Sequence, residues 1–258
     1  MKHIARKRFG QNFLHDQYVI NRIISRFHPQ NGQCIVEIGP GLGALTWPLL
    51  EQVDSLHAIE LDRDLVARFE MDPRARGRLN LHQHDALKFD FSSLVNSPGK
   101  LRIIGNLPYN ISTPLLFHLL EFAPFIDDMM FMLQKEVVQR ITAAPGGKNY
   151  GRLSVILQSQ CAVEKIIDVH PGAFSPPPKV DSAVVQLIPH TKAVAGITNR
   201  DNFSRIVKAS FAQRRKTLRN NLKGILTETE ITAAGIAPSV RAETLSLEDF
   251  SALTKQIK

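Results

Sequence analysis

The stretch Ile104-Gly105-Asn106-Leu107-Pro108-Tyr109 joins an apolar run to a short polar turn. The run that leads into it, Leu101–Ile104, predicts a buried strand. Pro108 would end that strand, because proline has no N–H to donate to a strand ladder. Asn106 would therefore lie at the carboxyl end of a strand, which is where open α/β sheets bind their ligands.

The residues of this turn are suited to hold an amino group on a planar ring. The Asn106 side chain and the Leu107 backbone each offer a carbonyl oxygen. Two adjacent acceptors match the two N–H donors of an exocyclic amine. Tyr109 adds a flat face on which a base could stack. An alternative interpretation of the same residues is a strand followed by an ordinary proline turn.

Three earlier segments also have the pattern of buried strands, and each leads to a residue suited to a ligand. They are predicted at Cys34–Ile38, Leu56–Leu61 and Leu79–His84. Gly39 opens a glycine-rich turn after the first, and glycine lets the backbone approach a ligand closely. Glu60 ends the second and could accept both ribose hydroxyls of a nucleoside, and Asp85 follows the third. Because parallel strands present their carboxyl ends at one edge of a sheet, we expect these residues to lie beside Asn106.

The glycine-rich turn alone is compatible with two nucleotide cofactors. Its sequence, Gly39-Pro40-Gly41-Leu42-Gly43-Ala44, also fits the loose dinucleotide fingerprint, in which a pyrophosphate lies at the N-terminus of the next helix. The acidic ends of the second and third strands instead suit one nucleoside, with its ribose and its adenine amino group. No obvious proton donor of the kind that hydride transfer needs follows in the sequence. The pattern therefore favours S-adenosylmethionine over NAD.

Composition is typical of a globular protein with a main domain and a smaller one. The chain has 258 residues, of which 43% are hydrophobic and 22% are charged. No apolar run is long enough to span a membrane, and the basic start has no apolar segment after it, so we expect neither a membrane anchor nor a secretory signal. Cys34 and Cys161 lie in apolar segments, which predicts free thiols in a reducing compartment. His82 and His84 share one face of a strand, but no third ligand is evident, so we expect no metal site.

Positive charge is concentrated at the two ends of the chain, whose net charge is +8. Residues 1–8 carry four cations and no anion, and residues 192–258 carry twelve cations and six anions. This distribution favours a polyanionic partner such as a nucleic acid. The alternative is an ordinary solvated surface.

A linker at Pro189–Asn199 divides the chain into predicted domains of residues 1–190 and 191–258. The second domain is predicted as helical, with an apolar stripe that includes Phe203 and Phe211. Its exposed cations are predicted to be Arg205, Lys208, Arg214, Arg215, Lys216, Arg219 and Lys223. In the first domain, Phe174 stands before a run of prolines and, as a lone aromatic, could belong to the core.

Five motifs of the chain belong together. They are Phe9-Gly10-Gln11-Asn12-Phe13-Leu14, Glu37-Ile38-Gly39-Pro40-Gly41-Leu42-Gly43, Asn106-Leu107-Pro108-Tyr109, Phe174-Ser175-Pro176-Pro177-Pro178-Lys179-Val180 and Arg214-Arg215-Lys216-Thr217-Leu218-Arg219-Asn220-Asn221-Leu222. As a set they resemble the motifs of the ribosomal RNA adenine N6-dimethyltransferases of the bacterial KsgA type, and the resemblance covers nearly the whole chain. It implies an α/β fold of the Rossmann-like class I methyltransferase type, with a seven-stranded, mainly parallel sheet whose last strand is antiparallel. A small C-terminal helical domain is implied as well.

The resemblance also implies what the protein acts on. The methyl donor would be S-adenosylmethionine, and the substrate would be 16S rRNA, with two adjacent adenosines in a loop near its 3′ end each dimethylated on N6. The implied partner is a 30S assembly intermediate in the cytoplasm, and we expect the enzyme to be a monomer.

The resemblance assigns roles to individual residues. Cofactor contacts are implied at Asn12, Leu14, Gly39, Glu60, Asp85 and Asn106. The target amine would be bound by Asn106 and Leu107, and the target base would stack between Tyr109 and Phe174. RNA contacts are expected at Arg214, Arg215, Lys216 and Arg219 of the helical domain.

Two other functions are compatible with much of this pattern. An antibiotic-resistance methyltransferase that acts on adenine N6 of large-subunit rRNA would share the N-terminal arm and the Asn-x-Pro-Tyr motif. A non-catalytic, methyltransferase-like nucleic-acid-binding factor would share the basic ends, but it would not need to keep Glu60 and Asn106. The Gly39–Gly43 turn and the full Phe174–Val180 segment favour the small-subunit enzyme.

Overall fold

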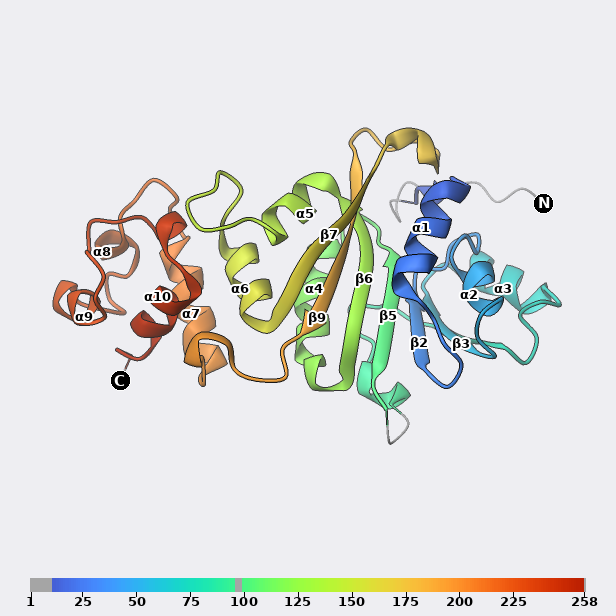
Figure 1. The fold of residues 1–258 in the computed structure, drawn as a ribbon, viewed down its shortest axis with the longest axis horizontal. Helices are drawn as coiled ribbons and strands as arrows, with labels where there is room; N and C mark the ends of the chain where they lie inside the picture. Colours follow the sequence, from blue (N-terminus) through green and yellow to red (C-terminus); the bar gives the residue numbers. More distant parts are fainter. Residues whose placement is uncertain (1–10, 96–98, 258) are drawn as a thin grey trace. The chain divides into compact units, whose positions relative to one another are not determined.

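A seven-stranded sheet forms the centre of the larger part of the molecule. The computed structural model describes residues 11–95 and 99–257, so residues 1–8 and the Phe9-Gly10 pair of the first motif lie outside the described residues. The strand order is β4-β3-β2-β5-β6-β9-β7, and Figure 1 labels the strands from β3 to β7 of this order. The strands are β2 (Cys34–Ile38), β3 (Leu56–Glu60), β4 (Leu79–Gln83), β5 (Leu101–Asn106), β6 (Ile126–Gln134), β7 (Cys161–Val169) and β9 (Ser182–Pro189).

The sheet is parallel from β4 to β6, and β9 runs antiparallel to β6. The predicted Rossmann-like methyltransferase fold, with an antiparallel last strand, is thus confirmed. The register pairs Ile38 with Ile59, Glu60 with Gln83, and Glu37 with Ile104. Because these pairs lie near the carboxyl ends of four neighbouring strands, the four ends open on the same edge of the sheet.

Helices cover the sheet and complete the second unit. They are α1 (Gln17–Phe27), α2 (Thr46–Leu50), α3 (Arg63–Met71), α4 (Ser112–Glu121), α5 (Lys135–Ile141), α6 (Arg152–Gln160), α7 (Arg200–Ser210), α8 (Leu218–Asn221), α9 (Glu228–Ala233) and α10 (Leu247–Thr254). Asp16 caps α1 as predicted, because its carboxylate accepts the Val19 N–H at 3.1 Å. The apolar face of α1 packs in one cluster with Ile35, Ile104 and Met130 of the sheet.

Two short strands form a separate sheet that the sequence did not predict. β1 (Phe13–Leu14) pairs antiparallel with β8 (Phe174–Ser175), so that Leu14 faces Phe174. Strands of two residues are too short to show a hydrophobic period. Their pairing joins the first predicted motif to the fourth, which lies about 160 residues away in the sequence.

The described chain divides into two compact units. Unit 1 contains the described residues up to Val138 and Glu164–Pro189, and unit 2 contains Gln139–Val163 and the residues from His190 onward. The predicted boundary at residue 190 differs from this division in one segment, residues 139–163. Hydrogen bonds tie that segment to the tail: the Tyr150 hydroxyl donates to the Leu245 carbonyl at 2.9 Å, and the Gly146 N–H donates to the Glu243 carbonyl at 2.7 Å. Contacts this far apart in the sequence have no local signal.

Within unit 2, an aromatic cluster holds the helices together. The rings of Phe203 on α7 and Phe250 on α10 lie 6.4 Å apart between centroids, and the Phe211 ring lies 5.8 Å from that of Phe250. The predicted apolar stripe of the tail is therefore the inner face of this small domain. Among the described residues, no helix is both long and apolar enough to cross a membrane.

The rings of His82 and His84 both pack edge-on against Phe89. The His82 ring also lies 3.0 Å from His57 Nδ1 on the neighbouring strand. Within the described ranges, no three His, Cys, Asp or Glu side chains are grouped as a metal site would need. Cys34 and Cys161 are free thiols.

Candidate active site

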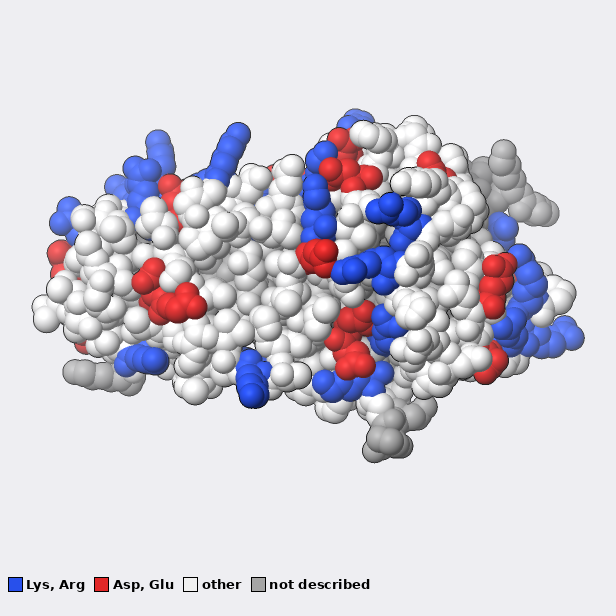
Figure 2. Space-filling view, viewed as in Figure 1, with Lys and Arg blue, Asp and Glu red and all other residues white. Residues whose placement is uncertain are grey.

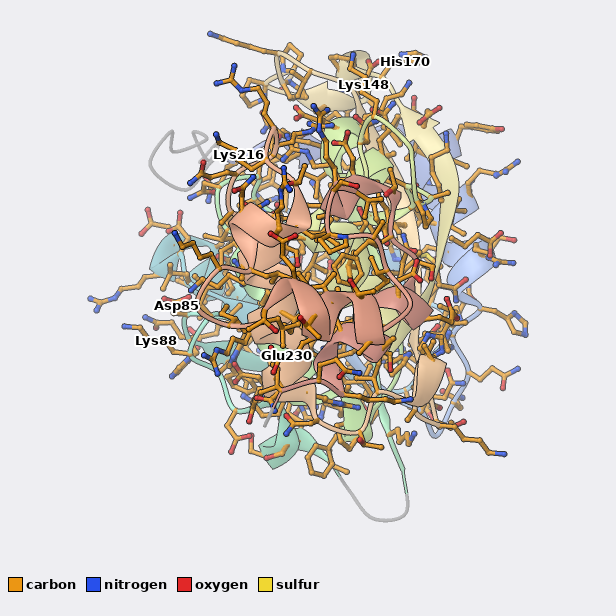
Figure 3. All side chains as sticks on the ribbon, turned by 90° about the vertical axis from the view of Figure 1, so that its left-hand side faces the viewer. Asp85, Lys88, Lys148, His170, Lys216 and Glu230 are labelled. Carbon is orange, nitrogen blue, oxygen red and sulfur yellow. The ribbon has the colours of Figure 1, made fainter. Side chains whose placement is uncertain are left out.

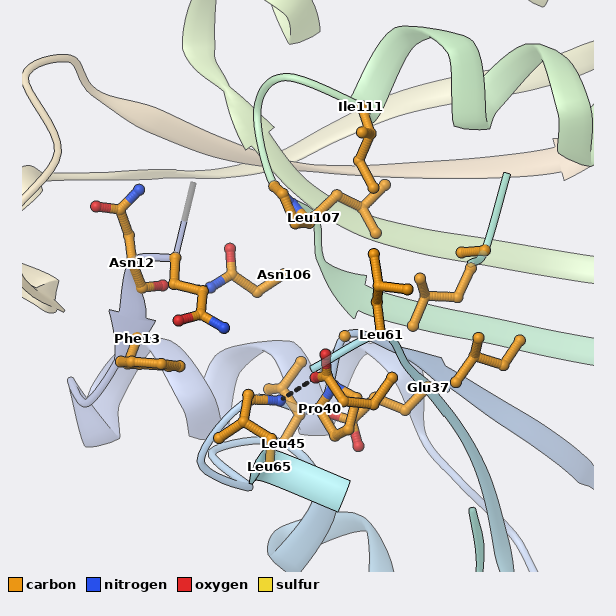
Figure 4. Close-up of a pocket in the computed structure, with 18 of the residues that line it drawn as sticks. Asn12, Phe13, Glu37, Pro40, Leu45, Leu61, Leu65, Asn106, Leu107 and Ile111 are labelled. Atoms are coloured by element: carbon orange, nitrogen blue, oxygen red, sulfur yellow. Dashed lines mark hydrogen bonds between the residues drawn. The ribbon is translucent and has the colours of Figure 1, made fainter. Parts of the chain in front are cut away.

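A pocket of about 330 Å³ opens at the carboxyl edge of the parallel strands. The residues predicted to contact the cofactor, the target amine or the base line this pocket with one exception. Those that line it are Asn12, Leu14, Gly39, Glu60, Asp85, Asn106, Leu107 and Tyr109. Figure 4 shows Asn12, Asn106 and Leu107 around its upper part and Leu61 and Pro40 below them. The strand ends thus bring together residues that are far apart in the sequence.

Two glycines allow the backbone to form this edge. Gly39 has a φ of +68°, a left-handed conformation that side chains with a Cβ rarely adopt, and its N–H donates to the Ile59 carbonyl at 2.9 Å. Gly105 lies where β5 passes close to β2. A Cβ atom there would stand 2.5 Å from the Ile38 carbonyl oxygen, so only glycine fits. The turn therefore comes close enough to Asn106 for one ligand to contact both.

Glu60 lies directly beneath the glycine-rich turn. Its carboxylate accepts the Asp62 N–H at 2.9 Å and the Gly41 N–H at 3.4 Å, and only 8% of the residue is exposed. Burial raises the pKa of this carboxyl, and the N–H groups of Asp62 and Gly41 partly oppose the rise. A carboxylate has about four lone-pair positions, so Glu60 keeps acceptor capacity toward the pocket.

Asn106 is held in one orientation by the N-terminal segment. Its Nδ2 donates to the Asn12 main-chain carbonyl at 2.9 Å. Because a carbonyl oxygen can only accept, this bond fixes the nitrogen end of the amide toward Asn12 and leaves the Oδ1 atom as an acceptor for a ligand. The next residue, Leu107, donates its N–H to the Met132 carbonyl at 3.2 Å, which anchors the loop to β6.

Comparison with known proteins identifies the family of this chain. Residues 2–258 match the family model described as ribosomal RNA adenine dimethylase. The chain belongs to this family. The chain is 57% identical to the "Ribosomal RNA small subunit methyltransferase A" of Thiobacillus denitrificans over 98% of this chain and 97% of that one. It is 54% identical to the protein of the same name from Pseudomonas aeruginosa, over 99% of this chain and 96% of that one.

Solved structures give the same fold for this rRNA adenine dimethylase. A dimethyladenosine transferase from Plasmodium falciparum superposes with a TM-score of 0.77 at 26% identity, covering 93% of this chain and 95% of that one. The 23S rRNA methyltransferase ErmE superposes with a TM-score of 0.74, covering 95% of this chain and 99% of that one. Its identity is 22%, so it supports the fold alone. The relatives that share more than 50% identity with this chain are named for the small subunit, in line with the predicted resemblance to the KsgA type.

S-adenosylmethionine is the cofactor of this rRNA adenine dimethylase, as predicted, and the pocket fits it. The glycine-rich turn and the Glu60 carboxylate lie side by side at the strand ends, as a ribose needs. Asp85 Oδ1 accepts the Leu87 N–H at 3.0 Å, which fixes the carboxylate at the pocket wall. Leu61 follows Glu60, and this apolar residue is 49% exposed although it lines the pocket. An adenine ring could cover it, since exposed apolar surface gains from contact with a flat ring.

Phe174 is the predicted site residue that does not line the pocket. It is 2% exposed and packs in the core cluster with Leu14, Val169 and Ala173, because the pairing of β8 with β1 turns its ring inward. Its role in stacking on the target base stays a prediction. That role requires the β8 segment to move enough to expose the ring.

Several pocket residues were missed by sequence reasoning. They are Gln11, Phe13, Glu37, Leu61, His84 and Ile111. Leu61 had a usable signal, because it directly follows the acidic end of a strand. Glu37 lies inside β2, where a buried strand position normally holds an apolar residue, and a lone acid in such a run is itself a signal.

Glu37 is a buried acid beside the cofactor pocket. It is 2% exposed, and its carboxylate accepts the Thr46 hydroxyl at 2.7 Å. Burial raises the pKa of Glu37 to about 8; the Thr46 hydroxyl lowers it and the nearby Glu60 raises it. Glu37 is therefore mostly protonated in the folded, ligand-free protein between pH 4.5 and about 8, where an exposed glutamate is charged.

We expect the stability of the ligand-free protein to fall as the pH rises from about 5 to about 8. In this range the folded protein keeps a proton on Glu37, whose ordinary pKa is 4.5, and the unfolded chain has released it. The contribution of Glu37 is complete below the unfolded pKa and is lost as the pH rises through about 8. Urea unfolding at several pH values should show a slope of up to about −1.4 kcal/mol per pH unit. Glu37→Gln should make that slope shallower, while the contribution of Glu60, whose pKa burial also raises, remains. The same slope in both proteins would contradict the assignment.

We expect Glu60→Ala to weaken S-adenosylmethionine binding. The ribose hydroxyls lose a charged acceptor, and a hydrogen bond to a charged group typically contributes about 1.5–3 kcal/mol, which corresponds to about a tenfold to hundredfold rise in Kd. Titration calorimetry measures this directly. Glu60→Gln keeps the shape of the side chain and should fall between wild type and Glu60→Ala. Unchanged affinity in Glu60→Ala would rule out the ribose contact.

The predicted RNA-binding cations lie in unit 2. Arg214, Arg215 and Lys216 are exposed in a turn between α7 and α8, and Arg219 is exposed on α8. The sequence had predicted a helix for this region, but residues 211–217 form turns, and the Lys216 N–H bonds to the Gln213 carbonyl at 2.9 Å. We call Arg214, Arg215 and Lys216 the basic loop.

The basic loop is anchored at one end. Arg214 Nε lies 3.3 Å from a Glu243 carboxylate oxygen, and its guanidinium also donates to the Lys148 main-chain carbonyl. Lys148 and Lys216 both lie toward the upper end of unit 2 in Figure 3. In Figure 2, lysine and arginine side chains project from the upper edge of this unit. Exposed cations on an ordered turn suit contacts with phosphate groups.

Proposed function

We propose that this rRNA adenine dimethylase transfers methyl groups from S-adenosylmethionine to N6 of two adjacent adenosines in a loop near the 3′ end of 16S rRNA. The observation that carries the proposal is the bond from Asn106 Nδ2 to the Asn12 carbonyl, which leaves Asn106 Oδ1 as an acceptor in the same pocket as Glu60. The small-subunit target is supported by the relatives, which are named for small-subunit rRNA.

Two adjacent acceptors activate the target amine. S-adenosylmethionine supplies a methyl group that is electrophilic because it is bonded to a cationic sulfur. The lone pair of an adenine amine is delocalised into the ring, so the amine is a poor nucleophile. Hydrogen bonds from its two N–H groups to Asn106 Oδ1 and the Leu107 carbonyl favour a more pyramidal nitrogen and direct its lone pair toward the cofactor side of the pocket. Alignment of the two reacting groups is the main catalytic contribution of these residues.

A dedicated base is not needed for the proton. The nitrogen that has accepted a methyl group is cationic and strongly acidic, so it releases its proton to solvent. Tyr109 offers no base either, because burial raises the pKa of its hydroxyl and keeps it protonated, an effect that the hydrogen bond to Ser182 only partly opposes. Asn106 and Leu107 therefore act by accepting hydrogen bonds, not by removing protons.

The target base has to leave its stack to reach Asn106. Extrusion of a base costs about a few kcal/mol, and stacking on an aromatic ring returns about 1–3 kcal/mol. Tyr109 lines the pocket and supplies one such ring. Phe174 supplies the second ring when the β8 segment exposes it.

The two parts of the chain divide the work. Unit 1 binds the cofactor and the target base, and unit 2, which contains residues 139–163 together with the tail, binds RNA through the basic loop and Arg219. The substrate particle is a 30S assembly intermediate in the cytoplasm, and the enzyme acts as a monomer. The excess of cations over anions in residues 192–258 supports the RNA-binding role.

Mass spectrometry of rRNA tests this function. Undermethylated 30S particles are incubated with the protein and S-adenosylmethionine, and the rRNA is digested into fragments. We expect the mass of four methyl groups on the fragment that carries the two adjacent adenosines. Methylation of large-subunit rRNA instead would favour the antibiotic-resistance type of enzyme. Binding without any mass change would favour a non-catalytic factor.

A further inference from the structure

A short hydrogen bond joins the pocket to the last strand of the sheet. The Tyr109 hydroxyl lies 2.6 Å from Ser182 Oγ. Tyr109 lines the pocket, whereas Ser182 is fully buried at the start of β9. The two residues are 73 positions apart, and nothing in the sequence pattern predicted their contact.

Ser182 is itself held firmly in place. It pairs with Gln134 in the antiparallel register of β6 and β9. The residue before it, Asp181, accepts the Lys135 N–H at 2.9 Å through its main-chain carbonyl. The serine hydroxyl is thus a fixed point at the carboxyl edge of β6.

The packing around Ser182 does not explain a hydroxyl there. The residues that follow it on β9, Ala183, Val184 and Val185, are apolar and buried. A buried hydroxyl is unfavourable unless it makes a hydrogen bond, so an alanine would serve the packing equally well. The partner that Ser182 has is the hydroxyl of a pocket residue. A buried polar group whose bond reaches into the site suggests a function in that site.

The bond limits how the Tyr109 ring can move. The Tyr109 carbonyl accepts the Ser112 hydroxyl at 3.1 Å, and the ring is fixed at its far end by Ser182. Because the backbone carbonyl and the side-chain hydroxyl of Tyr109 are both hydrogen-bonded, the ring is held in one orientation. A stacking surface that is already oriented loses less conformational entropy when the base arrives.

We propose that Ser182 is a positioning residue for methyl transfer, which fixes the Tyr109 ring as the platform on which the target adenine stacks. The inference rests on the proposed function. Ser182 touches neither the base nor the cofactor in this scheme, and it acts through the tyrosine hydroxyl alone.

A double-mutant cycle tests the proposal. Wild type, Ser182→Ala, Tyr109→Phe and the double variant are compared in single-turnover methylation of undermethylated 30S particles at saturating S-adenosylmethionine. Each single variant should lower the rate constant by about tenfold or less, which is the size expected for one hydrogen bond. The ring at position 109, whether tyrosine or phenylalanine, can still stack on the base in every variant. The affinity for the particle and the affinity for the cofactor should therefore change little. The double variant should be no slower than the slower single variant, because both changes remove the same bond.

Stability measurements separate positioning from a purely structural role. Tyr109→Phe leaves a buried hydroxyl on Ser182 without its partner, so its Tm should fall, and adding Ser182→Ala should recover part of the loss. Ser154→Ala is the matched control. Ser154 is fully buried in α6, and its hydroxyl donates to the Arg140 carbonyl. This control should lower the Tm and leave the rate constant unchanged.

Three results would overturn the proposal. The first is a wild-type rate constant in Ser182→Ala. The second is a double variant whose fold-loss in rate equals the product of the two single fold-losses. The third is a loss of rate in the variants that is fully accounted for by their fraction of unfolded protein. A wild-type protein that is inactive on 30S particles would instead reject the proposed function. In that case the coupling in Tm between Tyr109 and Ser182 would still be measurable.

Discussion

Asn106→Ala should lower single-turnover methylation about 10²-fold or more while the affinity for the 30S particle changes little. The variant loses an acceptor for the amine N–H, and that interaction is strongest as the nitrogen becomes pyramidal. An interaction made mainly in the transition state affects the rate constant and not binding. Removing one such oriented group typically costs about 10²–10³-fold in other enzymes. Affinity for S-adenosylmethionine should fall modestly, because Asn106 also lines the cofactor pocket.

The matched control for this variant is Asn80→Ala. Asn80 is exposed on β4 and does not line the pocket. It should methylate at the wild-type rate. An Asn106→Ala protein that methylates at the wild-type rate would remove Asn106 from the mechanism. A loss of particle affinity in proportion to the loss of rate would make Asn106 a binding residue instead.

The parts of the fold that the sequence predicted are those with a strong local pattern. Buried strands such as β2 and β5 are mainly apolar runs, and the Gly39–Gly43 turn follows β2 directly. Because parallel strands end at one edge of the sheet, Glu60 can be placed near Asn106 from the sequence alone, before any contact between them is known. This is why Gly39, Glu60, Asp85 and Asn106 could be placed in one pocket from the sequence.

The parts that the sequence did not predict depend on contacts between distant segments. The bond from Asn106 to the Asn12 carbonyl spans 94 residues, and the bond from Tyr109 to Ser182 spans 73. The inward turn of Phe174 follows from the two-residue pairing of β8 with β1. None of these contacts leaves a hydrophobic period or a turn signal in the sequence. The sequence thus indicates which residues gather at the site, while the contacts between distant segments set how they are oriented.

Reversal of the charge at the basic loop is the second change with a large expected effect. We expect binding to 30S particles to weaken about 10²-fold at low salt in the triple variant Arg214→Glu, Arg215→Glu and Lys216→Glu. Cations that neutralise phosphates release bound counterions from the RNA, and the variant loses this favourable contribution. The slope of log K against log salt concentration should become shallower by about one unit for each phosphate that the loop no longer neutralises. Filter binding at several salt concentrations measures both quantities. Cofactor affinity should stay the same, since the loop belongs to unit 2 and the pocket to unit 1.

A matched triple reversal distinguishes direct binding from net charge. Arg68, Arg76 and Lys88 are exposed in unit 1, and changing each of them to Glu alters the net charge of the protein by the same amount. If the basic loop touches RNA, this second variant should keep most of the wild-type salt slope, because distant charges are screened beyond about 10 Å at 0.1 M salt. Equal losses of affinity in the two variants would mean that overall charge attracts the particle. An unchanged slope in the basic-loop variant would mean that Arg214, Arg215 and Lys216 are only solvated surface.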